Sequence, residues 1–386
     1  MENGNVIVTA VGDYNLDEPD NPEAIFEYTA DMLRRADIAF CQLECPYSDK
    51  GSMNSNGPRG AIQRDVGNLK GIPFAGFDVV SMAGNHIMDW GQDALLDCRE
   101  RLRSEGITVI GAGANIEEAR KPAILERDGN RIAFLSYCSV APKGYYASPG
   151  KAGIAPMRVI THYEPFEDDQ PGTPCETMTF PVPRDLEALT GDIRSLRSKA
   201  DVVVVSQHWG IHGLPYKIAD YQPIVAHAAI DAGADIVVGH HPHMLKGVEV
   251  FKGKVILYSI GAFAYSRRPS TRADYLKQHD PDWETARQRV WKEVVQGLAP
   301  SGKPGDYGFH GHSKRSMIIN MRIKNKELRR VSFIPVMINE KNQPQPLSPS
   351  DPKGQDVIRD LATATDKANM NGRFAVDGEE VVISPS

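Results

Sequence analysis

The chain has 386 residues, of which 41% are hydrophobic and 24% charged, and its formal net charge is −6 at pH 7. This composition is typical of a water-soluble globular protein with one large or two medium domains, and the acidic balance gives no support for nucleic-acid binding. The five cysteines include no Cys-x-x-Cys pair, so we expect reduced thiols and a cytoplasmic protein. We also expect no signal peptide and no membrane anchor, because the sequence starts without a basic, apolar leader and contains no apolar run of membrane-spanning length.

Short runs rich in β-branched residues alternate with segments of helical spacing through the first two thirds of the chain. Strands are predicted at 5–11, 37–43, 77–82, 108–110, 131–136, 201–206, 235–238 and 254–259. Helices are predicted at 22–36, 92–104, 184–199 and 220–232. Residues 46–69 and 139–180 are rich in turn formers or poor in apolar groups, and we expect irregular structure there. The alternation predicts an α/β protein with layers around a largely buried sheet.

The last third of the chain has a different pattern. Residues 266–312 form a charged insertion without a clear strand, whereas 316–323 and 327–336 predict a hairpin that closes the domain. Beyond 340 the sequence is polar apart from one short helix near 354–367. We therefore predict one domain over 1–336 and a polar extension over 337–386. Long segments without a core usually bind or cover something, so we expect the insertion and the loop 46–69 to flank the site and select the substrate.

Polar side chains stand directly after several predicted strands. They are Asp13, Glu44, Asn85, His86, His208, His241 and His243. Four of the eleven histidines lie at the ends of two such strands, where α/β folds gather ligands, namely His208, His240, His241 and His243. Pro242 stiffens the turn between the last two, so their imidazoles can converge on one ion. Oxygen and imidazole ligands suit Mn, Fe, Zn, Mg or Ca, and we predict a divalent metal ion as cofactor.

His86 precedes Asp89 by three residues. This spacing suits an acid–base histidine that a carboxylate orients. The alternative interpretation makes Asp89 the N-cap of the helix predicted at 92–104. A metal bound nearby could lower the pKa of a water molecule or polarise a carbonyl or phosphoryl oxygen.

The motifs and their order resemble the CapA-like family, which is named for poly-γ-glutamate capsule synthesis and whose fold resembles the calcineurin-like metallophosphoesterases. The resemblance covers roughly residues 5–265, with weaker similarity to about 336. It rests on Gly12-Asp13, Leu43-Glu44, Asn85-His86-x-x-Asp89-x-Gly91, Gly111-Ala-Gly113, His208-Trp-Gly210, Asp231-Ala-Gly-Ala-Asp235, Gly239-His-His-Pro-His243 and Tyr258-Ser-Ile-Gly261. It implies a sandwich of two central sheets flanked by helices, with a metal site at the C-terminal ends of the strands. By position, it implies the ligand set Asp13, Glu44, Asn85, His208, His241 and His243, with His86 as the catalytic histidine.

The chain also departs from the family pattern. His212 stands where the family usually has a glutamate, and Gln42 where it has an asparagine. The phosphoesterase motif Asp-x-His is here Asp13-Tyr-Asn15, which argues against a complete dinuclear site, and Ala262 replaces the asparagine of Ser-Leu-Gly-Asn-Phe. Capsule proteins of this family usually carry a membrane anchor. These departures favour a soluble relative with its own substrate.

Three functions fit these residues. The first is a metal-dependent hydrolase of an amide, peptide or ester bond, with His86 as general acid and a peptide, amide or other small anionic molecule as substrate. The second is a metal-dependent peptide epimerase, for which His212, His310 and His312 would suit two-base chemistry. The third is a non-catalytic binder of anionic polymer or peptide that uses Arg59, Arg64, Arg267, Arg268, Lys314 and Arg315. The predicted catalytic residues are His86, Asp89 and His212. The predicted substrate-binding residues are Asn15, Arg59, Trp209, Tyr265, Arg267, His310 and His312.

Overall fold

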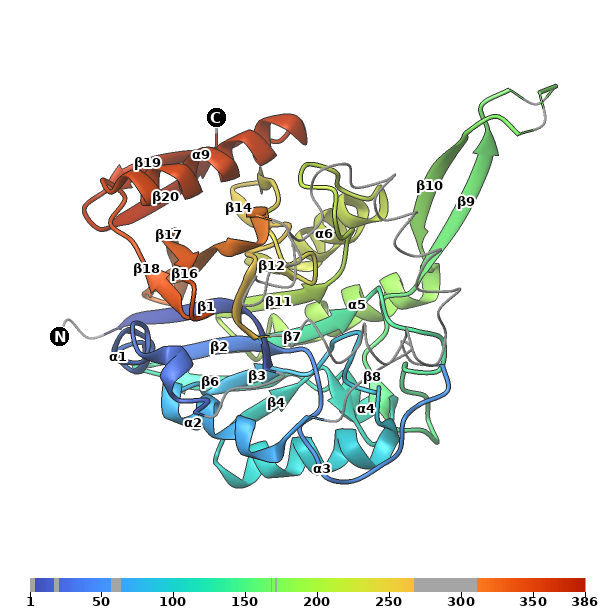
Figure 1. Ribbon diagram of the computed structural model, residues 1–386, viewed down its shortest axis with the longest axis horizontal. Coiled ribbons are helices and arrows are strands. Elements are labelled where there is room, and N and C mark those ends of the chain that lie inside the picture. The colour runs from blue at the N-terminus through green and yellow to red at the C-terminus, as the bar shows by residue number, and fades with distance from the viewer. Residues whose placement is uncertain are drawn as a thin grey trace.

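Two large β-sheets pack face to face, with helices on their outer sides (Figure 1). The computed structural model describes residues 4–16, 21–56, 64–167, 169–170, 172–266 and 311–385. The predicted arrangement of two central sheets flanked by helices is therefore confirmed. Arg59, Arg267, Arg268, His310 and almost all of the predicted insertion lie outside the described residues.

The first sheet combines a parallel half with an antiparallel half. Its main path runs β19-β20-β17-β16-β1-β2-β3-β4, with β15 beside β1 and β18 beside β17. The parallel half comprises β1 (Asn5–Leu16), β2 (Ile38–Leu43), β3 (Val79–Ser81), β4 (Thr108–Ile110) and β15 (Ala262–Ser266). The antiparallel half comprises β16 (Arg315–Lys324), β17 (Glu327–Ile338), β18 (Pro344–Pro346), β19 (Gly372–Asp377) and β20 (Glu380–Pro385).

The second sheet has six strands in the order β13-β14-β12-β11-β7-β6. Its parallel centre comprises β7 (Asn130–Cys138), β11 (Val202–His208), β12 (Ile236–His240) and β14 (Lys254–Leu257). Its antiparallel edges are β6 (Ala123–Arg127) and β13 (Val248–Phe251). Every residue of β11 and β12 is buried, as expected for parallel strands covered on both faces.

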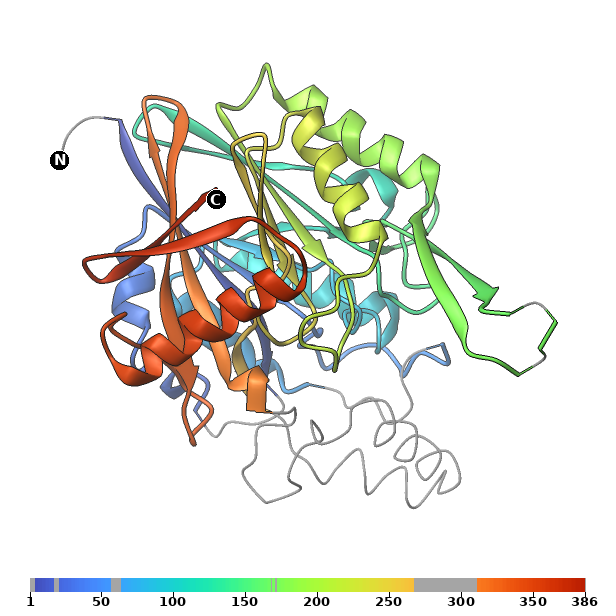
Figure 2. The same cartoon turned by 90° about the horizontal axis from the view of Figure 1, so that it is seen from above.

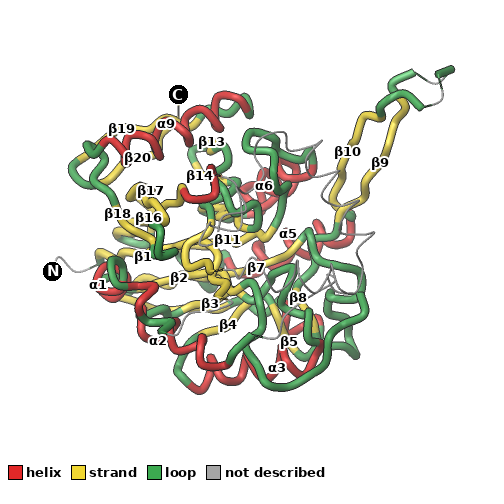
Figure 3. Tube along the Cα trace, viewed as in Figure 1, coloured by secondary structure: helices red, strands yellow, loops and turns green. Residues whose placement is uncertain are grey.

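Three apolar layers hold the sandwich together. The central layer lies between the sheets, where Phe40 of the first stacks on Phe134 of the second with ring centroids 6.0 Å apart. The outer face of the first sheet packs against α1 (Ala30–Arg34), α2 (Gly71–Ala75) and α3 (Gly91–Ser104). The outer face of the second packs against α5 (Pro183–Leu196) and α6 (Tyr221–Ala232) (Figures 2 and 3). The layers fix the strand ends relative to one another, and the candidate site is built there.

Two segments differ from the sequence predictions. In place of one helix at 22–36 there are a 3-10 turn, η1 (Ala24–Phe26), and the short α1. Residues 139–180, predicted to be irregular, contain β8 (Gly153–Ile154) and the pair β9 (Val159–Pro165) and β10 (Cys175–Pro181), which projects from the body as a two-stranded ribbon (Figure 1). Most side chains of this ribbon are exposed, so it lacks the buried apolar face whose period usually indicates a strand.

The C-terminal part contains the predicted hairpin, β16–β17, and the predicted helix, α9 (Pro352–Lys367). The prediction missed β18, which pairs with β17, and also β19 and β20, which extend the first sheet through the pairing of β20 with β17. The division at residue 336 stays a prediction. No helix among the described residues is long and apolar enough to cross a membrane, and the cytoplasmic location stays a prediction.

Candidate metal centre

Parallel strands of the two sheets bring the predicted ligands to one edge of the sandwich. Asp13 lies near the end of β1, and Glu44 follows β2. His208 ends β11, while His241 and His243 follow β12. All five side chains are at least 94% buried, because the two sheets and their connecting turns close around them.

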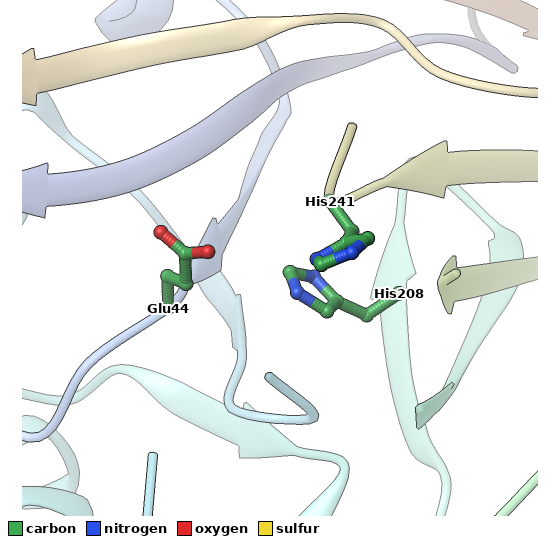
Figure 4. Close-up of side chains that lie close together, drawn as sticks. All are labelled: Glu44, His208 and His241. Atoms are coloured by element: carbon green, nitrogen blue, oxygen red, sulfur yellow. The ribbon is translucent and has the colours of Figure 1, made fainter. Parts of the chain in front are cut away.

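The closest group is formed by Glu44, His208 and His241. A carboxylate oxygen of Glu44 and one ring nitrogen from each histidine all lie within 4.8 Å of one another. Figure 4 shows the carboxylate opposite the two rings. His243 also contacts Glu44, with its Nε2 3.0 Å from Glu44 Oε1, and its Nδ1 lies 3.3 Å from Asp13 Oδ2. The side chains of two sheets therefore meet at the Glu44 carboxylate.

Two asparagines complete the group. Asn85 Oδ1 lies 2.8 Å from His208 Nε2, which places Asn85 beside the imidazole of the second sheet. Asn15, which replaces the histidine of the phosphoesterase motif, donates from Nδ2 to Glu44 Oε2 over 2.6 Å. Asn15 therefore lies within the group.

The backbone around the group is strained and tightly packed. His241 has φ 96° and His243 has φ 53°, the left-handed region that non-glycine residues rarely adopt. A Cβ on Gly239 would lie 2.3 Å from the carbonyl oxygen of Tyr258 and 2.6 Å from Trp209 Nε1, so only glycine fits. Trp209 is fully buried and donates Nε1 to that carbonyl, so its side chain supports the turn after His208.

His86 is held by Asp89. Its Nδ1 lies 2.8 Å from Asp89 Oδ2, and its ring is 26% exposed. Burial lowers the pKa of His86, but the charge and hydrogen bond of Asp89 outweigh that effect, and the pKa lies above its usual value. The alternative role of Asp89 as a helix cap is wrong, because the N-cap residue of α3 is Trp90 and no side chain caps that helix. Asp89 Oδ1 accepts a hydrogen bond from Tyr145 OH at 2.7 Å.

Burial and neighbouring charges set the protonation of the other groups. Burial lowers the pKa of His208 and of His241 far below the usual value, so both rings are neutral. Burial also disfavours charge on His243, but Glu44 and Asp13 outweigh it and raise the pKa of His243 to about 10. Burial raises the pKa of Asp13 to about 6. At neutral pH the protein alone therefore places one imidazolium between two carboxylates.

The donor set fits a divalent cation. Within the described ranges, Asp13 Oδ1, His208 Nδ1 and His241 Nδ1 are buried polar atoms without a hydrogen-bond partner. Such atoms are uncommon in folded proteins and indicate a bound partner or a functional role. Carboxylate, amide and imidazole donors together suit Mn, Fe, Zn, Mg or Ca. The geometry does not distinguish among these ions.

The remaining predicted residues divide into near and distant ones. The ring of His212 stacks on His241 at 3.9 Å, and its Nε2 donates to the carbonyl oxygen of that residue over 2.6 Å. Burial lowers the pKa of His212 to about 3. The Tyr265 ring lies 5.1 Å from that of His243. His312 lies elsewhere, with its Nδ1 2.9 Å from Asp360 Oδ1 of α9, so the structure does not bring it to the ligand group.

The chain is similar to several known proteins. The "PGA biosynthesis protein CapA" of Bacillus subtilis is 28% identical over 251 residues. This alignment covers 65% of this chain and 59% of the relative. The "Capsule biosynthesis protein CapA" of Bacillus anthracis is 26% identical over 63% of this chain and 54% of its own length. The chain thus spans little more than half the length of these relatives. Among solved structures, the calcineurin-like phosphoesterase YfkN from Bacillus subtilis gives a TM-score of 0.38 at 11% identity, covering 95% of this chain and 99% of that one.

The family model described as bacterial capsule synthesis protein PGA_cap matches residues 3–266. This match covers well over half of the chain and includes all six predicted ligands. The chain therefore belongs to the bacterial capsule synthesis protein PGA_cap family.

Proposed function

We propose that this protein is a metal-dependent hydrolase of an amide or ester bond. The observation that carries the proposal is the convergence of Glu44, His208 and His241 within 4.8 Å, beside a histidine that a carboxylate orients. The proposed ligands are Asp13, Glu44, Asn85, His208, His241 and His243. A divalent ion held by these residues would supply Lewis acidity to the bond under attack.

The proposed role of His86 is general acid. Asp89 engages Nδ1 of the ring, so Nε2 is the nitrogen that can hand a proton to the leaving group. Because the pKa of His86 lies above its usual value, the ring holds a proton more readily than a free histidine does. A general acid positioned in this way contributes typically about 10²–10⁴-fold in rate.

The proposed substrate is an anionic, peptide-like molecule. The support comes from the relatives, whose names refer to PGA biosynthesis and capsule biosynthesis. A γ-glutamyl amide is therefore the first substrate class to test, and a phosphodiester is the second because of the resemblance to phosphoesterases.

The test combines metal analysis with turnover. Protein purified without chelators should contain a divalent ion, and with added Mn²⁺ it should hydrolyse γ-glutamyl-p-nitroanilide or bis(p-nitrophenyl) phosphate. His241→Ala should lose both the ion and the activity. His227→Ala is the matched control, because His227 also pairs with a carboxylate, Glu249 at 2.8 Å, but lies on α6 outside the ligand group. Hydrolysis that persists at full rate after metal removal would contradict the proposal.

Peptide epimerisation is the second candidate. It is favoured by His212, a half-buried neutral imidazole that stacks on His241 and could act as a second base. Uptake of solvent deuterium at the Cα of an unbroken peptide would select this function over hydrolysis. Multiple turnover on any substrate would exclude the third candidate, a non-catalytic binder of anionic polymer.

A further inference from the structure

We propose that Tyr145 is a positioning residue for the reaction: it holds the Asp89 carboxylate in the orientation in which Asp89 aligns His86. The inference rests on the proposed function, because that function assigns proton transfer to His86. Sequence patterns do not indicate Tyr145, which lies within the segment 139–180 for which we expected irregular structure.

The geometry leaves the carboxylate little freedom. Asp89 Oδ2 lies 2.8 Å from His86 Nδ1, and Asp89 Oδ1 accepts from the Tyr145 hydroxyl at 2.7 Å. Because the two oxygens have different partners, rotation of the carboxylate would break one hydrogen bond or both. Asp89 is 6% exposed and Tyr145 is fully buried, so water cannot readily replace the tyrosine hydroxyl.

Tyr145 is suited to act as a permanent donor. Burial, together with the neighbouring charge of Asp89, raises the pKa of Tyr145 far above its usual value. The hydroxyl therefore keeps its proton. In catalytic sites, the carboxylate that orients a histidine is often held by a further hydrogen bond. A fixed donor to that carboxylate therefore helps to set the orientation of the histidine ring.

The strands β5 and β8, which we call the frame, hold the backbone of Tyr145. The carbonyl oxygen of Tyr145 accepts from Ile154 N of β8 over 3.1 Å. The neighbouring strand is β5 (Ala112–Gly113), which pairs with β8. A Cβ on Gly153 would lie 2.4 Å from the Tyr145 carbonyl oxygen, so close approach of the two segments requires glycine.

This frame gives the Gly111-Ala-Gly113 turn a physical role. None of the proposed ligands lies in this turn. Its residues Ala112 and Gly113 form β5, which pairs with β8, and β8 in turn hydrogen-bonds to the backbone of Tyr145. The start of α3 is tied to the same segment, because Gln92 Oε1 accepts from Ala152 N over 3.1 Å. His86, Asp89 and Tyr145 are thus held by connected elements.

The matched control is a second buried tyrosine–aspartate pair. Tyr137 is also fully buried, and its hydroxyl donates to Asp192 Oδ2 of α5 over 2.6 Å. Tyr137→Phe and Tyr145→Phe both remove one hydroxyl from a buried hydrogen bond to an aspartate. A merely structural role for Tyr145 predicts equal effects of the two substitutions on turnover.

The experiment measures kcat and KM of the metal-loaded protein with γ-glutamyl-p-nitroanilide and bis(p-nitrophenyl) phosphate. Tyr145→Phe should lower kcat by about 10-fold with KM and metal content unchanged, whereas Tyr137→Phe should leave kcat unaltered. In a His86→Asn background, Tyr145→Phe should cause no further loss. The proposal is overturned by a wild-type kcat in Tyr145→Phe, or by an equal additional loss when His86 is absent.

A second readout does not depend on turnover. In ¹⁵N-histidine-labelled protein, the Nδ1–H resonance of His86, assigned by its loss in His86→Asn, should shift or broaden in Tyr145→Phe and stay in place in Tyr137→Phe. If the wild type hydrolyses neither probe, the proposed function fails, and this resonance still decides the positioning role. An unchanged His86 resonance in Tyr145→Phe would then refute that role.

Discussion

Binding of a divalent ion should release about one proton per ion at pH 8, and that proton should come from His243. The His243 ring lies 3.0 Å from Glu44 and 3.3 Å from Asp13. Despite the opposing effect of burial, these carboxylates raise its pKa to about 10. An imidazole can ligate a cation only after it loses this proton. His208 and His241 are neutral already, because burial lowers their pKa values well below the usual range, and they contribute no proton.

The pH dependence follows with a definite sign. Raising the pH towards 10 favours the unprotonated form of His243, so the apparent affinity for the ion should rise. One linked proton corresponds to about tenfold in affinity, or about 1.4 kcal/mol, for each pH unit. Asp13, whose pKa is raised by burial to about 6, is ionised above neutrality and adds little to this slope. Between pH 7 and pH 9 the affinity should therefore increase roughly a hundredfold.

Isothermal titration calorimetry with Mn²⁺ in two buffers of different ionisation enthalpy measures the proton release directly. His243→Ala should bind the ion more weakly and release close to no proton. His227→Ala should release as many protons as the wild type, because its carboxylate partner, Glu249, lies outside the ligand group. Proton release near zero in the wild type, or an unchanged release in His243→Ala, would show that the assigned protonation of His243 is wrong.

The remaining predictions test the general acid and the packing behind the site. His86→Asn should keep the ion and the fold but lower turnover by about 10²–10⁴-fold; loss of the ion, measured by elemental analysis, would instead make His86 a ligand. Gly239→Ala should lower the free energy of unfolding by about 1–3 kcal/mol, because its Cβ would press on the Tyr258 carbonyl oxygen and on Trp209. Gly150→Ala is the control, because a Cβ on Gly150 would have no atom within 4 Å. Equal shifts of the thermal unfolding temperature in the two variants would contradict the packing argument.

The central strands and the strand-end residues were accessible from the sequence for a physical reason. In β11 the residues from Val202 to Val205 are all buried, and a strand covered on both faces is a continuous apolar run. The polar residue that ends such a run marks the edge of the sheet. His208, at the end of β11, and Glu44, after β2, illustrate this directly.

The turn after β12 gives two adjacent histidines different surroundings. His240 and His241 are adjacent, and both counted among the four strand-end imidazoles. His240 is the last residue of β12; its ring lies 5.9 Å from that of Phe40, and its Nδ1 lies 3.9 Å from Asp13 Oδ1. His241 follows the strand with a left-handed φ of 96°, and its ring belongs to the ligand group. The histidine run does not specify the backbone conformation of this turn, which decides where the second ring lies.

The parts that the sequence did not predict depend on contacts between distant segments. β20 is a short strand whose place is set by pairing with β17, where Ser332 lies opposite Val382. Tyr145 reaches Asp89 across 56 positions of chain, through the frame that β5 and β8 provide. No periodicity within either segment encodes such a partner.

Two kinds of unfavourable feature occur together at the candidate metal centre. The left-handed backbone of His241 and His243 and the unpartnered buried atoms of Asp13 and His208 occur within the same group of side chains. Each feature costs stability, and the rigid strands β1 and β11 hold the residues in place against that cost. A cation bound between the carboxylates and the neutral imidazoles would satisfy these atoms together. These features therefore support the proposal that an ion binds between these side chains.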